Sequence, residues 1–74
     1  MWVKISDEPI PTYGMHGKEF MLWLSYNDYY GHYHFCDSEC VFGVWDSNCE
    51  CFYESKTHKE IDSRDIVQWW KEIN

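Results

Sequence analysis

Basic side chains are scarce in this sequence, and a long central stretch has none. The 74 residues include 13 Asp and Glu but only 6 Lys and Arg, which gives a formal net charge of −7. Seven acids and no Lys or Arg lie from Glu19 through Glu54. Proteins that bind nucleic-acid phosphates normally present a basic patch. The charge pattern therefore argues against direct nucleic-acid binding. The acids either keep an aromatic sheet soluble or form an acidic surface that attracts a partner protein with a basic surface.

Long apolar segments are also missing. The residues Trp2-Val3-Lys4-Ile5 are followed at once by polar and acidic residues, so the apolar core of a signal peptide is not present. No run approaches the ~20 apolar residues of a membrane helix. We therefore expect a cytoplasmic protein without membrane contact, in the host cytoplasm if it is phage-encoded, with its four cysteines reduced.

Aromatic side chains are abundant. The 4 Phe, 5 Trp and 6 Tyr residues make up 15 of the 74 positions. Each buried ring can remove roughly 150–250 Å² from water, which compensates for the thin core of so short a chain. The composition predicts one small folded domain over residues 1–74 rather than a disordered chain.

The apolar and alternating stretches predict strands of a mainly β fold, either a small antiparallel meander or a partly closed sheet. One segment is ambiguous, because residues 66–73 fit a strand as well as a short C-terminal helix, which would make the fold α+β. The main predicted strands are residues 20–26, 32–36, 40–45 and 49–53, and the predicted turns are residues 27–31, 37–39 and 46–48.

Six His and Cys residues between positions 32 and 51 raise the question of a zinc site. A turn at residues 37–39 would place Cys36 opposite Cys40, with His34 on the same face. The last two cysteines would point to the other face, so the four thiols could not surround one tetrahedral zinc. We therefore expect no cofactor, and a partial zinc site at His34, Cys36 and Cys40 is the alternative.

No residue pattern indicates a reaction, and we expect no enzymatic activity. The carboxylates of Asp37 and Glu39 fall in a predicted turn, where solvation explains them. The thiols and His34 have no evident oxyanion hole or orienting group beside them. Gly14 and Gly17 lack the strand, loop and helix context of a phosphate-binding loop.

The two ends of the chain carry short motifs of a known family. Trp2-Val3-Lys4-Ile5-Ser6-Asp7-Glu8-Pro9 looks like its opening Trp-x-x-x-Ser-x-x-x-Pro signature, with two residues rather than three between Ser6 and Pro9. Residues 20–24 look like its first long strand, and Ile66-Val67-Gln68-Trp69 looks like its closing element. The chain thus resembles the short phage and prophage proteins catalogued as domain of unknown function 551. It departs from them in its His- and Cys-rich middle and in lacking a proline-rich tail after Trp69. The resemblance implies a small, mostly β accessory protein of phage type, and it transfers no functional residue.

These observations predict a non-enzymatic, phage-type binding or inhibitor protein. Its partner would be a host defence or nucleic-acid-handling protein, whose basic groove the acidic side chains would occupy in place of phosphates. The alternatives are a module that sequesters a nucleotide signal, which a homodimer could form, and a zinc-stapled structural mini-domain. The predicted partner-binding residues are Asp28, Tyr29, Tyr30, Asp37, Glu39, Trp45 and Asp46.

Overall fold

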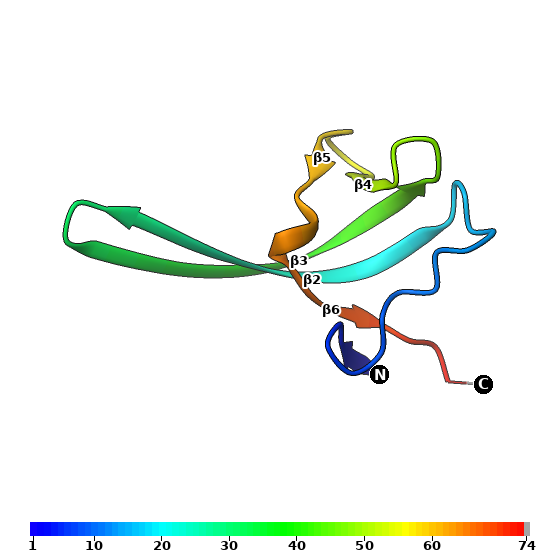
Figure 1. Cartoon of the computed structure of the whole chain (residues 1–74), viewed down its shortest axis with the longest axis horizontal. Helices are drawn as coiled ribbons and strands as arrows, with labels where there is room; N and C mark the ends of the chain where they lie inside the picture. Colours follow the sequence, from blue (N-terminus) through cyan, green and yellow to red (C-terminus); the bar gives the residue numbers. More distant parts are fainter. Residues whose placement is uncertain (74) are drawn as a thin grey trace.

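Six antiparallel strands form a single sheet in the computed structural model, in the order β1-β6-β2-β3-β4-β5 (Figure 1). The structure describes residues 1–73, except for the side chains of residues 28–30 and 33–35. The predicted mainly β fold is confirmed. The elements are β1 (Trp2–Lys4), β2 (Glu19–Tyr30), β3 (Tyr33–Asp46), β4 (Cys51–Glu54), β5 (Glu60–Ile61), a 3-10 turn η1 (Ser63–Asp65) and β6 (Ile66–Trp70).

The two longest strands, β2 and β3, pair from Glu19 opposite Val44 to Tyr30 opposite Tyr33. The chain therefore reverses at residues 31–32, where Gly31 has a φ of 58°. The turn predicted at residues 37–39 is wrong, because these residues belong to β3. Of the turn predicted at residues 27–31, only Gly31 lies in the observed turn. Polar residues in these segments stay extended because the ladder of cross-strand hydrogen bonds outweighs their local turn preference.

The hairpin of β2 and β3 extends well beyond the rest of the sheet. Strand β6 pairs with β2 only as far as Leu24, and β4 pairs with β3 only from Gly43. Residues 25–38 consequently form a two-stranded projection, which we call the arm. The arm leaves the body of the molecule as a long ribbon and accounts for its greatest extent of 44 Å (Figure 1).

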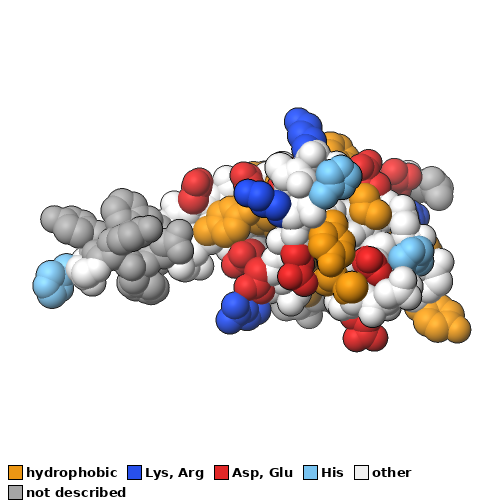
Figure 2. All heavy atoms as spheres, turned by 90° about the horizontal axis from the view of Figure 1, so that it is seen from above, with side chains coloured by type: hydrophobic (Ala, Val, Ile, Leu, Met, Phe, Trp, Pro, Cys, Tyr) orange, Lys and Arg blue, Asp and Glu red, His pale blue; other side chains and the backbone are white. Residues whose placement is uncertain are grey.

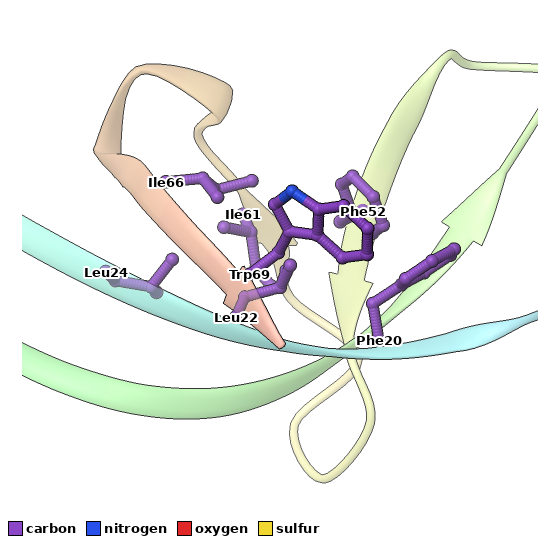
Figure 3. Close-up of a cluster of buried hydrophobic side chains, with 7 residues drawn as sticks. All are labelled: Phe20, Leu22, Leu24, Phe52, Ile61, Ile66 and Trp69. Carbon is purple, nitrogen blue, oxygen red and sulfur yellow. The ribbon is translucent and has the colours of Figure 1, made fainter. Parts of the chain in front are cut away.

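The hydrophobic core lies on the inner face of the sheet, which curls so that β5 and β6 approach each other over β2 (Figure 3). Alternate residues of β2 form one side of this core. The rings of Phe20 and Phe52 pack edge to face, with 5.8 Å between their centroids. The fold is thus a partly closed sheet around one small core. Its buried members are Phe20, Leu22, Leu24, Phe52, Ile61, Ile66 and Trp69.

The C-terminal segment is a strand, so the predicted alternative of a C-terminal helix is wrong. The register of β6 against β2 shifts between Trp23 and Leu24, so that Trp69 lies opposite Leu22 but Ile66 lies opposite Leu24. This irregularity lets both Ile66 and Trp69 point inward although they are three residues apart. A bulged strand therefore produced the spacing that is typical of a helical face.

Candidate partner-binding surfaces

Two of the predicted carboxylates, Asp37 in the arm and Glu39 just beyond it, lie on the same side as Tyr26. Asp37 lies opposite Tyr26, and Glu39, at the base of the arm, lies opposite Leu24. The hydroxyl of Tyr26 donates a 2.8 Å hydrogen bond to Oε1 of Glu39. Oδ1 of Asp37 accepts a hydrogen bond of 2.8 Å from the backbone N–H of Ser38. Both acids are exposed, so their negative charges face the solvent.

The ring of Tyr26 anchors this part of the arm to the body, because it packs against the edge of the core. Burial, the hydrogen bond to Glu39 and the charges of nearby acids together raise the pKa of Tyr26 to about 12, with burial as the largest cause. Tyr26 is therefore neutral at physiological pH, and its hydroxyl is available to hold Glu39 in place.

Three predicted partner-binding residues belong to the far part of the arm. Asp28, Tyr29 and Tyr30 are the last residues of β2. Their side chains lie outside the described part of the structure. The arm contains no Lys or Arg, so its charge at neutral pH comes from Asp28 and Asp37 together with Glu39 at its base.

The last two predicted residues lie far from the arm. Nine residues of extended strand separate Asp46 from Asp37, which corresponds to about 30 Å. Trp45 points toward the core and packs on Phe52 with 4.9 Å between ring centroids. Oδ1 of Asp46 accepts hydrogen bonds from the backbone N–H groups of Asn48 at 2.8 Å and Cys49 at 3.3 Å. The predicted residues therefore fall in two separate places, one in and beside the arm and the other at the C-terminal end of β3.

A hollow of about 450 Å³ lies at the end of the sheet opposite the arm. Val44 and Tyr53, which lie opposite each other on the outer face of β3 and β4, contribute apolar and aromatic surface to it, and Trp45 also borders it although its ring packs on Phe52. Hydrogen bonding to the thiols of Cys49 and Cys51 raises the pKa of Tyr53 well above its usual range, so its phenol stays neutral. The remaining residues around this hollow are His16, Gly17, Glu19, Asp46, Glu54, Ser55 and His58.

The pairing that suggested a partial zinc site is wrong. Cys36 lies opposite Asn27 rather than Cys40, and its Sγ donates to Oδ1 of Asn27 at 3.3 Å. Cys40 lies opposite Trp23, four residues further along the same strand, which places the two cysteines about 13 Å apart. No group of three His, Cys, Asp or Glu residues able to hold a metal occurs among the described residues, and the side chain of His34 lies outside them.

Sequence reasoning missed a tryptophan cluster on the outer face of the sheet. Trp2 contacts Trp23 and Trp70 edge-on, with ring centroids 5.7 and 5.6 Å apart. The cluster arises because β6 lies between β1 and β2, which no local pattern reveals. In a strand, the neighbours of an inward-pointing residue point outward. This alternation is the sequence signal that could have placed the three tryptophans on the outer face.

Sequence reasoning also missed most of the hollow, although it included Trp45 and Asp46. The walls come from β3, from β4 and from the turns at residues 16–18 and 55–58, which the fold brings together. Figure 2 shows acidic side chains interspersed with hydrophobic ones over the body of the molecule, with the arm to one side.

Comparison with protein-family models, curated proteins and solved structures gives no match to this chain. The similarity to domain of unknown function 551 therefore stays a prediction from short motifs. None of the helical segments among residues 1–73 is long and apolar enough to cross a membrane.

Proposed function

We propose that this protein is a non-enzymatic binding protein that docks its arm onto a basic surface of a partner protein. The observation that carries the proposal is that residues 25–38 project from the body, and that none of the arm side chains that the structure describes is among the buried core residues. A two-stranded ribbon without a core of its own is only marginally stable in water. Its length is therefore better explained by contact with a partner than by folding of this chain.

The charges of the arm indicate the kind of partner. Asp37 and Glu39 are exposed, and neither the arm nor its base contains a Lys or Arg to neutralise them. Such a ribbon attracts a basic groove over a distance of about 8–10 Å at moderate salt. Carboxylates spaced along a ribbon can occupy the positions of nucleic-acid phosphates in that groove. Our proposed partner is accordingly a host defence or nucleic-acid-handling protein, which the arm would inhibit by blocking that groove.

The hollow disfavours the alternative of a nucleotide-binding module. Glu19, Asp46 and Glu54 line it, and the lining includes no Lys or Arg. The phosphates of a nucleotide would therefore meet three carboxylates and no permanent positive charge, which is unfavourable.

The experiment compares partner capture by the wild-type protein and by arm variants. In the shortened variant, an Asn-Gly turn replaces residues 27–36 and joins Tyr26 to Asp37, which already face each other across the hairpin. The charge variant is Asp37→Asn with Glu39→Gln. Its matched control, Asp7→Asn with Glu72→Gln, removes the same two charges from exposed positions outside the arm.

Host lysate is passed over each immobilised protein at about 0.1 M and 0.5 M salt, and captured proteins are identified by mass spectrometry. We expect the same basic proteins to bind the wild type and the matched control at low salt. They should be lost from both arm variants and from the wild type at high salt. Equal capture by the shortened variant, in a protein that still unfolds cooperatively, would refute docking by the arm.

A further inference from the structure

We propose that this protein pairs with a second copy of itself through the outer face of its sheet. Strands β1, β6, β2 and β3 each carry large apolar side chains on that face, and we call this set the aromatic face. Its members are Trp2, Met21, Trp23, Phe42 and Trp70. The inference does not depend on the arm or on the partner of the arm.

Cross-strand pairing makes the aromatic face continuous. Trp2 lies opposite Trp70, and Met21 lies opposite Phe42, so each pair shares one face of the sheet. The ring of Trp2 also contacts that of Trp23, which joins β1 to β2 across β6. Phe42 is 48% exposed and Trp70 is 38% exposed. Two large rings of this face are therefore open to contact from outside the chain.

Strand β2 is apolar on both of its faces between Phe20 and Leu24. Its buried residues, Phe20, Leu22 and Leu24, stand on one side of the strand and pack against core residues of β4, β5 and β6 (Figure 3). Met21 and Trp23 point to the other side and are only half-buried. Uninterrupted apolar strands are typical of sheets that are covered on both faces. The sequence of β2 therefore indicates a second layer over the aromatic face.

The distribution of charge favours a second copy as that layer. The chain has a formal net charge of −7, so two copies repel each other unless their contact avoids the acids. Asp37 lies opposite Tyr26, and Glu39 lies opposite Leu24, which belongs to the core. Because side chains alternate between the two faces of a strand, both acids stand on the core side of the sheet. Alternation thus removes these two exposed acids from the aromatic face.

The aromatic face is neutral, and one charged group of each sign borders it. Lys4 in β1 and Glu19 in β2 are each two residues from a member of the face, so they point to the same side. Toward the arm, the face continues with the uncharged pair of Ser25 and Ser38. Such a face can meet its own copy without net repulsion, and it offers no charge to the basic partner proposed for the arm.

The area of the outer face suffices for a weak dimer. The face includes residues 19–27 of β2 and 36–44 of β3, together with the short strands β1 and β6. At about 4.8 Å between strands and 3.4 Å per residue, these segments cover about 400 Å² of flat sheet. Side chains that stand on the sheet expose more than this, so two copies would bury about 1,000 Å² in total, near the lower limit for a specific interface. We expect a dissociation constant on the order of 10 μM.

Sedimentation analysis of the wild-type protein tests the proposal. We expect a monomer at about 1 μM and a dimer at about 500 μM. Raising the salt to about 0.5 M should leave the dimer unchanged or strengthen it, because salt screens the repulsion between two acidic chains. Capture of a basic partner by the arm should instead be lost at high salt, so the two proposals can fail separately.

A pair of variants assigns the dimer to the aromatic face. Phe42→Lys places a charge on this face in both copies and should weaken dimerisation at least about tenfold, because each lysine would lose water without gaining a partner. Tyr13→Lys makes the same change at a fully exposed aromatic residue in the turn before β2, and it should dimerise like the wild type. Near-UV circular dichroism checks that both variants keep the wild-type fold.

Thiol labelling of the wild-type protein gives a second readout that needs no variant. Cys40 lies opposite Trp23 on the outer face, whereas Cys49 lies in the turn after β3, and both are exposed. The rate at which excess maleimide modifies Cys40, followed by mass spectrometry, should fall at least about fivefold between 1 and 500 μM protein. The rate at Cys49 should not change.

Three results would overturn the proposal. The first is a wild-type protein that stays monomeric up to about 500 μM. The second is equal dissociation constants for Phe42→Lys and Tyr13→Lys when both variants are folded. The third is a dimeric wild-type sample in which Cys40 is modified as fast as in the monomer, because the copies would then meet through another surface.

Discussion

Gly43 is the position at which a single methyl group should most directly disturb the curled sheet. A Cβ atom there would lie 2.7 Å from Cδ1 of Leu22, 3.1 Å from Cδ1 of Ile61 and 3.5 Å from Cβ of Phe52. Leu22 is 0% exposed, so its side chain has no free space into which it could retreat. Gly43→Ala should therefore force either a shift of the backbone or an unfavourable rotamer of Leu22.

The expected magnitude follows from two opposing contributions. Overpacking of a dense core costs typically about 1–3 kcal/mol. Replacing glycine by alanine at a compatible backbone position returns about 0.4–1 kcal/mol by restricting the unfolded chain. Gly43→Ala should therefore lower the free energy of unfolding by about 1–2 kcal/mol. For a chain of this length that corresponds to a fall in Tm of about 5–15 °C.

Thermal unfolding followed by near-UV circular dichroism measures this effect. Ser38→Ala, an exposed change in the same strand, should alter stability by less than about 0.5 kcal/mol. Adding Leu22→Val to Gly43→Ala should recover about 1 kcal/mol relative to the sum of the single changes, because it removes the clashing methyl group. A Gly43→Ala protein as stable as the wild type would refute the packing argument.

Three further predictions concern the anchor of the N-terminal segment, the base of the arm and the arm itself. Trp69→Phe should cost about 1–3 kcal/mol in denaturant unfolding, because it leaves a cavity and removes the 2.8 Å hydrogen bond from Nε1 to the carbonyl of Glu8. Because the folded-state pKa of Tyr26 is raised to about 12 from 10.0, its stabilising contribution is present below pH 10 and is lost as the pH rises toward 12. Tyr26→Phe should remove that part of the alkaline decline in stability, as measured by urea midpoints across this pH range. Backbone amides of residues 25–38 should exchange with deuterium at least ~10-fold faster than that of Leu22, and equal protection would contradict an arm that opens independently of the body.

The comparison of β2 with β6 shows what sequence patterns could predict here. The apolar run at residues 20–26 predicted a strand, and the structure shows that Phe20, Leu22 and Leu24 are its buried members and alternate with less buried neighbours. Ile66 and Trp69 are also buried, but their spacing of three favoured a helix as much as a strand. The register shift against β2 resolves that ambiguity, and it depends on a partner strand more than forty residues away in the chain.

The predicted metal and partner sites show the same dependence on register. Placing a turn at residues 37–39 made Cys36 face Cys40, whereas the continuous ladder of β2 and β3 places them along one strand. Because the predicted turn was misplaced, the cross-strand partners predicted for the residues on both sides of it were wrong as well. The partner-binding role of Trp45 and Asp46 stays a prediction, and their separation from Asp37 follows only from the extended strand between them.

The sequence by itself determined that the chain forms strands and that its negative charge gathers in the middle without a neutralising base. Those properties depend on composition and on the alternation of residues close in the chain, which act before any tertiary contact forms. The tertiary structure alone decided where the long hairpin turns, how far the arm projects and which residues surround the hollow. These features depend on pairing between distant strands, where the summed hydrogen bonds and buried area of the whole ladder outweigh the preference of any short segment.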